Sequence, residues 1–166
     1  MRWRAWERLR ALVGRLPRPS AAQPQRGARA AVEPPAAAEA SDRVLVVDDD
    51  ALYREVAQIL LEDAGLEVDA AADGPEALRL ARAGGYALVL MDVQMPGMDG
   101  LETTRRLRQL PACGELPIIG MSANARTEDP QRCLDAGMND FLAKPFHAQS
   151  LVATVQRWCP VRPGKD

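Results

Sequence analysis

The fold is decided by the stretch YALVLMD at residues 86–92, which is followed by VQMPGMDG at residues 93–100. Six largely apolar residues in succession predict a strand buried on both faces, as in the middle of a parallel sheet. The run ends at Asp92, so this carboxylate is expected at the carboxyl edge of the strand, where open α/β sheets bind ligands. The Pro-Gly and Asp-Gly pairs that follow predict a turn, which presents Asp92 at a rim. Alone, such a carboxylate is more often a helix cap or a turn residue.

Strands and helices alternate along the chain from residue 43 onward. Apolar strands are predicted at 43–47, 66–71, 118–121 and 140–143, and helices at 52–64, 75–83, 100–110, 128–136 and 147–158. In the first helix the apolar residues Leu52, Val56, Ile59 and Leu60 recur at helical spacing. Five strands, each followed by a helix, predict an α/β fold with a doubly wound five-stranded parallel sheet and five helices. The common strand order at this size is 2-1-3-4-5.

That strand order places the first and third strands side by side, so the carboxylates that follow them should converge. Asp48 and Asp49 end the first strand and Asp92 ends the third. Three carboxylates at close range cannot all remain ionised without a counter-charge, and oxygen-only ligands at a shallow rim suit Mg²⁺. The alternative is a run of solvated acids that cap the first helix, which fits Asp50 best.

A cation and a hydroxyl are predicted at the same edge. Lys144 follows strand 140–143 and precedes Pro145, and a cis bond to that proline would aim its ammonium back over the rim. Ser122 ends the neighbouring strand. A metal, a cation, a hydroxyl and an attacking carboxylate together form a site for an acyl phosphate, in which Asp92 is the nucleophile. Taken singly, Lys144 is more often a surface lysine and Ser122 a turn hydroxyl.

These segments resemble the receiver domain of two-component response regulators over residues 43–159. The matching motifs, in the family's order and spacing, are VLVVDDD (44–50), LVLMDVQMPGMDGLE (88–102), GMSAN (120–124) and FLAKPF (141–146). The resemblance implies a flavodoxin-like fold, with Asp92 as the phosphoacceptor. It also implies that Mg²⁺ is held by Asp92, Asp48, Asp49 and the backbone carbonyl of Gln94. Further implied roles are a switch hydroxyl for Ser122, a switch aromatic for Phe141 and a phosphate-contacting lysine for Lys144.

The resemblance also implies partners. The residues within these motifs resemble receivers attached to hybrid sensor kinases most. The expected donor is therefore a sensor histidine kinase or a phosphotransfer domain. The signal is expected to leave through the face formed by helix 128–136, strand 140–143 and helix 147–158, toward a downstream protein or a homodimer. Seven residues after Cys159 predict no output domain and no direct DNA binding. The only catalysis expected is the chain's own phosphorylation and dephosphorylation.

Two other functions compete with this interpretation. A pseudo-receiver would keep the fold as a binding or adaptor module and would not depend on phosphorylation. A phosphatase of the haloacid dehalogenase type also uses an aspartate nucleophile after a strand, but that family places a second aspartate two residues later. Here that position is Gln94. The complete set of acids, Ser122 and Lys144 argues against a chain that needs only the fold.

Composition divides the 166 residues into segments of different character. Residues 1–42 contain eight arginines and four acidic residues. From Arg43 onward the chain contains thirteen basic and nineteen acidic residues. We expect a basic amphipathic helix at 1–16, a disordered Pro/Ala-rich linker at 17–41, a receiver domain at 42–159 and a tail at 160–166. The helix could make weak contact with an anionic membrane surface, or it could be a frayed leader without a role.

The cysteines and the hydropathy pattern predict a compartment. Cys113, Cys133 and Cys159 are odd in number and widely spaced, which favours free thiols in a reducing cytosol. No apolar run approaches the roughly 20 residues of a membrane span. The sequence therefore predicts a cytoplasmic protein.

Overall fold

The computed structural model describes residues 41–123 and 130–159. These residues form a five-stranded parallel sheet in the order β2-β1-β3-β4-β5, which is the predicted order. Along the chain the elements are β1 (Arg43–Val47), α2 (Ala51–Asp63), β2 (Glu67–Ala71), α3 (Gly74–Arg82), β3 (Leu88–Asp92), α4 (Gly100–Arg108), a 3-10 turn (Pro111–Cys113), β4 (Ile118–Ser122), α5 (Pro130–Ala136), β5 (Asp140–Ala143) and α6 (Ala148–Trp158).

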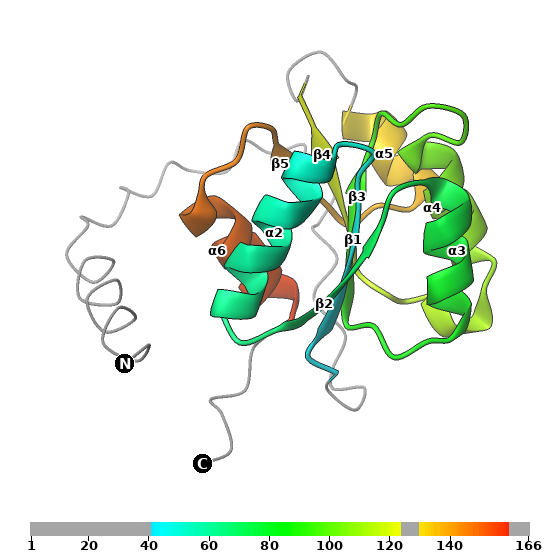
Figure 1. The fold of residues 1–166 in the computed structure, drawn as a ribbon. Coiled ribbons are helices and arrows are strands. Elements are labelled where there is room, and N and C mark those ends of the chain that lie inside the picture. Colours follow the sequence, from blue (N-terminus) through cyan, green and yellow to red (C-terminus); the bar gives the residue numbers. More distant parts are fainter. Residues whose placement is uncertain (1–40, 124–129, 160–166) are drawn as a thin grey trace, which may run out of the picture. The chain divides into compact units, whose positions relative to one another are not determined.

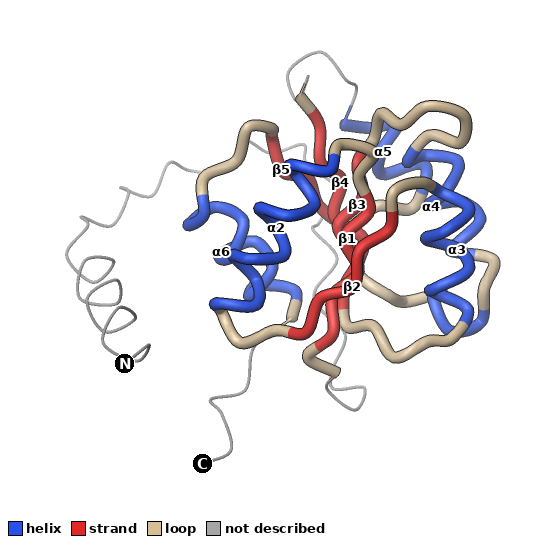
Figure 2. Tube along the Cα trace, in the orientation of Figure 1, coloured by secondary structure: helices blue, strands red, loops and turns tan. Residues whose placement is uncertain are grey.

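Helices cover both faces of this sheet. Figures 1 and 2 show α2 and α6 on one face and α3, α4 and α5 on the other. Each face has its own apolar core, and β3 contributes to both, with Leu88 and Leu90 toward α2 and α6 and Val89 and Met91 toward the opposite helices. All five residues of β3 are buried, as expected of a central strand.

Aspartates start three of the helices. Asp50, Asp73 and Asp99 each precede a helix in extended conformation, and their side chains accept hydrogen bonds from the backbone N–H groups of Leu52, Glu76 and Glu102. These contacts satisfy N–H groups that the first helical turn leaves without a partner. The Asp50 interaction agrees with the sequence interpretation of that residue as a helix cap.

The predicted apolar pattern locates α2 correctly but does not mark its buried side. Ala57 and Leu61 are the buried residues of this helix. Leu52, Val56 and Ile59 are 65%, 38% and 51% exposed. The buried side is set by where the helix contacts the sheet. On α2 that contact is made by Ala57 and Leu61, and Leu60 of the predicted pattern is half-buried against the same core. Periodicity alone cannot distinguish this side from a neighbouring apolar stripe.

Two predicted boundaries within the described residues differ from the structure by two residues, and several others differ by one. β3 starts at Leu88, not at Tyr86, and the Tyr86 hydroxyl donates to Asp69 at 2.7 Å while Arg43 lies over the tyrosine ring. α4 ends at Arg108, and the chain then forms the 3-10 turn before β4. The predicted start of the fourth helix, at residue 128, lies outside the described residues, and so do the segments 1–16 and 160–166 and all of the linker but residue 41.

The three cysteines are buried thiols. Within residues 41–123 and 130–159, no helix is long and apolar enough to cross a membrane.

Candidate functional site

Three carboxylates meet at the carboxyl edge of the sheet. Asp48 and Asp49 follow β1, and Asp92 is the last residue of β3, the strand paired with β1. One carboxylate oxygen from each lies within 4.8 Å of the others. Asp48 and Asp92 are buried, and Asp49 is exposed. The three acids therefore converge as predicted, and one of them, Asp49, is exposed to solvent.

The loop after Asp92 is held tightly against the first turn of α4. The backbone N–H of Gln94 donates to Asp92 Oδ1 at 3.1 Å, and the N–H of Gly100 donates to the carbonyl of Val93 at 3.0 Å. A Cβ on Gly100 would lie 2.0 Å from the carbonyl oxygen of Asp92. Only glycine permits this approach of backbone to backbone, so Gly100 helps to fix the position of Asp92.

Lys144 neutralises part of the charge at this rim. Its Nζ lies 2.5 Å from Asp48 Oδ2 and 3.1 Å from Asp92 Oδ2, and its side chain is 7% exposed. The backbone N–H of Lys144 donates to the carbonyl of Ser122, and the bond to Pro145 is cis. Besides Lys144 the chain has one lysine, Lys165, among 21 basic residues. A lysine buried between two acids is not the surface lysine of the ordinary alternative.

Burial and charge act in opposite directions on the titration of the site. Burial raises the pKa of Asp92 from 3.8 to about 6, and the charge of Asp48 also raises it, while Lys144 and the Gln94 N–H lower it. For Lys144, burial lowers the pKa, but the contacts with Asp48 and Asp92 outweigh burial and raise it. At neutral pH the site therefore holds an ionised Asp92 and a charged lysine.

The donor set fits a hard divalent cation. Three carboxyl groups and one ammonium meet at the rim, so the acids outnumber the cation there. Asp48 Oδ2 is buried, and the Lys144 ammonium lies 2.5 Å from it. Such an oxygen can take a metal as its ligand. Asp48, Asp49 and Asp92 are thus suited to Mg²⁺, which prefers carboxylate oxygens and retains water ligands.

The remaining residues predicted from the sequence lie at the same edge or one strand away. Ser122 is the buried last residue of β4, the strand that pairs with β3. Gln94 is exposed and follows Asp92 by two residues. Phe141 is half-buried in β5, opposite Gly120 in the ladder. A Cβ on Gly120 would lie 3.2 Å from the Phe141 ring, so the glycine leaves room for it.

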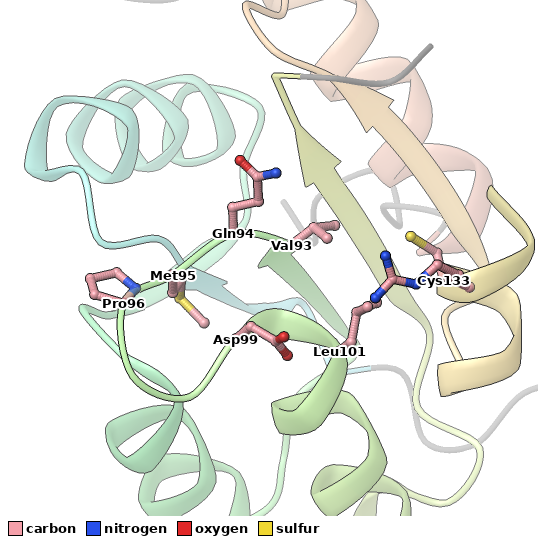
Figure 3. Close-up of a pocket in the computed structure, with 8 residues that line it drawn as sticks. Val93, Gln94, Met95, Pro96, Asp99, Leu101 and Cys133 are labelled. Carbon is pink, nitrogen blue, oxygen red and sulfur yellow. The ribbon is translucent and has the colours of Figure 1, made fainter. Parts of the chain in front are cut away.

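A cavity of about 460 Å³ lies beside the rim and not within it. Figure 3 shows residues that line it: Gln94, Met95 and Pro96 from the loop after β3, Asp99 and Leu101 at the start of α4, and Cys133 of α5. Asp48, Asp92 and Lys144 do not line it. The acidic rim therefore lies outside this cavity.

Two residues of the site escaped the sequence analysis, and both lie on α2. The Tyr53 ring centroid lies 4.4 Å from Lys144 Nζ. Arg54 Nη1 donates to the backbone carbonyls of Asp48 and Asp49 at 2.7 and 3.0 Å and so fixes the acidic loop. The sequence held one signal for them: Tyr53 and Arg54 come about one helical turn after the three consecutive aspartates 48–50.

Comparison with known proteins gives matches across this region. The family model of the response regulator receiver domain matches residues 44–156. An uncharacterised 14.6 kDa protein from the sodA1 3' region of Leptolyngbya boryana is 43% identical over 116 residues, which cover 70% of this chain and 88% of that protein. Sensor protein GacS of Pseudomonas syringae pv. syringae is 40% identical over 136 residues, or 80% of this chain, but the match spans 15% of GacS.

Solved structures match to a similar extent. The receiver domain of the sensor histidine kinase PA1611 of Pseudomonas aeruginosa PAO1, crystallised with a magnesium ion coordinated in the active site cleft, has 38% identity and a TM-score of 0.68. That match covers 74% of this chain and 100% of the other. The chemotaxis protein CheY4 of Vibrio cholerae has 36% identity and a TM-score of 0.67, and the match covers 69% of this chain and 96% of the other.

Proposed function

The chain belongs to the response regulator receiver domain family of two-component systems, and on that premise we propose that its acidic rim is a phosphoacceptor site. Asp92 is the residue that receives the phosphoryl group. The observation that carries this proposal is the Lys144 ammonium placed 3.1 Å from Asp92 Oδ2 and 2.5 Å from Asp48 Oδ2, at the end of the central strand. A purely structural acid at this position has no need of a buried lysine and two further carboxylates.

The proposed reaction is transfer from phosphohistidine. An oxygen of the Asp92 carboxylate attacks phosphorus, the P–O bond forms, and the P–N bond breaks, so the histidine nitrogen leaves with its electron pair. Lys144 stabilises the negative charge that builds on the phosphoryl oxygens. Asp48, Asp49, Asp92 and the Gln94 carbonyl would hold Mg²⁺, which would neutralise more of that charge. Attack of water on phosphorus later releases phosphate and restores the carboxylate.

The consequence of phosphorylation is a shift between two conformations. The new phosphoryl oxygens attract the Ser122 hydroxyl, and the Phe141 ring then fills the space that Ser122 leaves. Ser122 and Phe141 lie on neighbouring strands, so the change alters the face formed by α5, β5 and α6. We propose this face as the contact for a downstream protein or for a second copy of the chain.

The donor and the segment boundaries are also proposed. Receiver domains act with histidine kinases or phosphotransfer domains, and one of these is the proposed donor. Within the chain, residues 42–159 are the proposed receiver domain, preceded by an amphipathic helix at 1–16 and a linker at 17–41 and followed by a tail at 160–166.

Beryllofluoride, a mimic of the phosphoryl group, provides the test. With Mg²⁺ present, it is expected to shift the backbone NMR signals of Asp92, Ser122 and Lys144, and also those of Phe141 in β5. Asp92→Asn should abolish all of these shifts, because the amide cannot bind beryllium. Asp99→Asn is the matched control, since Asp99 lies seven residues later at the start of α4 and an asparagine also caps a helix.

The outcomes separate the two functions. If the wild-type protein is folded and its NMR spectrum does not change with beryllofluoride, the phosphorylation-independent binding module is favoured. Shifts in the Asp92→Asn variant equal to those of the wild type would show that the reagent binds elsewhere, and the proposal would then be wrong.

A further inference from the structure

Three groups that favour a positive charge surround the ammonium of Lys144. Two are the carboxylates of Asp48 and Asp92, at 2.5 and 3.1 Å from Nζ. The third is the face of the Tyr53 ring, whose centroid lies 4.4 Å from Nζ. An aromatic face attracts a cation electrostatically when the cation lies within about 6 Å of the ring centroid. Tyr53 therefore acts on the same ammonium as the two acids, but from α2 and without a negative charge of its own.

The Tyr53 ring is itself held in place. It packs at a tilt of 57° against Phe146, with 5.7 Å between the ring centroids. Phe146 in turn packs against the apolar core between the sheet and α2 with α6. Phe146 also follows Lys144 by two residues. The ring thus has a defined orientation, set by the same segment of chain that carries the lysine.

We propose that Tyr53 is a positioning residue for phosphoryl transfer, which fixes the Lys144 ammonium over Asp92 through the face of its ring. This rests on the proposed function of Asp92 as the phosphoacceptor. The two carboxylates hold the ammonium by charge, and the ring face adds an attraction from α2. An ammonium already in place does not need to be reoriented as charge develops on the phosphoryl oxygens.

The prediction is that the rate depends on an aromatic ring at position 53 and not on its hydroxyl. With acetyl phosphate as donor, the bond from Asp92 oxygen to phosphorus forms and acetate leaves. Tyr53→Leu is expected to slow this step about 10-fold, which corresponds to about 1.4 kcal/mol and lies within the range of cation–π contacts. Tyr53→Phe keeps the ring face and should react at nearly the wild-type rate.

A spectroscopic measurement reports the position of the lysine directly. The chain contains two lysines, Lys144 and Lys165, so isotope labelling of lysine alone gives two sets of side-chain signals. A ring face shields the protons above it, so the Cε protons of Lys144 should resonate upfield. They should move toward the Lys165 position in Tyr53→Leu and stay in Tyr53→Phe. These spectra need neither phosphorylation nor metal.

The matched control is the other tyrosine. Tyr86 also faces a cation, with Arg43 at 5.2 Å from its ring centroid, but it precedes β3 and lies at the amino edge of the sheet, opposite the rim. Tyr86→Leu should leave the rate and the Lys144 signals unchanged. Thermal unfolding of every variant is recorded, and Tyr53→Gln replaces Tyr53→Leu if the latter does not fold.

The possible results are distinct. A Tyr53→Leu rate equal to wild type, equal losses in Tyr53→Leu and Tyr53→Phe, or a slow Tyr53→Leu with unmoved Lys144 signals would each overturn the inference. An equal loss in Tyr86→Leu would do the same. If the wild type itself is not phosphorylated on Asp92, the proposed function fails, whereas the Lys144 signals still report whether Tyr53 positions the lysine.

Discussion

Replacing Asp92 with asparagine should stabilise the metal-free protein, although Asp92 is the residue on which the proposed function depends. Burial raises the pKa of this carboxyl from 3.8 to about 6, even after the favourable effect of Lys144. The folded state therefore binds more protons than the unfolded chain between about pH 4 and 6. The contribution of Asp92 to stability is greatest below this interval and falls as the pH rises through it. At neutral pH the folded protein carries the full cost of an ionised, buried Asp92.

The size of the effect follows from the shift. A change of about two pKa units, at about 1.4 kcal/mol for each unit, gives an upper limit of about 3 kcal/mol. Asp92 is 5% exposed, but Asp49 and Gln94 beside it are open to water, which screens the charge. We therefore expect Asp92→Asn to raise the free energy of unfolding by about 1.5 kcal/mol at neutral pH. Lys144 keeps its contact with Asp48 in this variant.

Urea unfolding in the presence of a chelator is the assay. The advantage of Asp92→Asn should be present at pH 7.5 and shrink at pH 4.5, where the wild-type carboxyl is protonated. Added Mg²⁺ should stabilise the wild type more than the variant, because a ligand stabilises the state that binds it. Asp99→Asn, at an exposed helix cap, should change the free energy of unfolding by less than about 0.5 kcal/mol. A metal-free Asp92→Asn protein less stable than wild type at pH 7.5, or an advantage that acid leaves unchanged, would refute this reasoning.

Two further substitutions test how the rim is held. Gly100→Ala should cost about 2 kcal/mol or more in urea unfolding, because its Cβ would lie 2.0 Å from the Asp92 carbonyl oxygen. Gly114→Ala, where a Cβ meets nothing within 4 Å, should be neutral, and equal losses in both would contradict this explanation. Lys144→Met should destabilise the metal-free protein by about 3 kcal/mol at pH 7.5, because Asp48 and Asp92 lose their cation. The loss should be smaller at pH 5, where Asp92 is largely protonated, and a loss independent of pH would indicate packing as its cause.

The sequence predicted the topology because the end of each strand can be recognised from the residues there. Each apolar run that forms a strand ends close to the residue where the structure ends it, and helix-capping aspartates follow the strands. The strand order places β1 beside β3, so the convergence of Asp48, Asp49 and Asp92 follows from topology alone. Lys144 and Ser122 reach the same edge for the same reason, since β4 and β5 end there.

What the sequence did not predict depends on contacts between elements. The buried side of α2 is set by Ala57 and Leu61, and the larger apolar residues Leu52 and Ile59 are exposed. The contact between Tyr53 and Lys144 joins residues 91 positions apart, and it depends on the rotation of α2 about its axis. This rotation results from packing. The spacing of apolar residues along α2 does not distinguish the side that is buried from the side next to it.

The central claim is that the buried Asp92 accepts a phosphoryl group. Incubation with acetyl phosphate and Mg²⁺, followed by intact-mass measurement and peptide mapping, tests it most directly. We expect the addition of one phosphoryl group to the wild-type chain, located on Asp92, and no addition to Asp92→Asn. An unmodified wild-type protein, or a phosphoryl group retained in the Asp92→Asn variant, would contradict it.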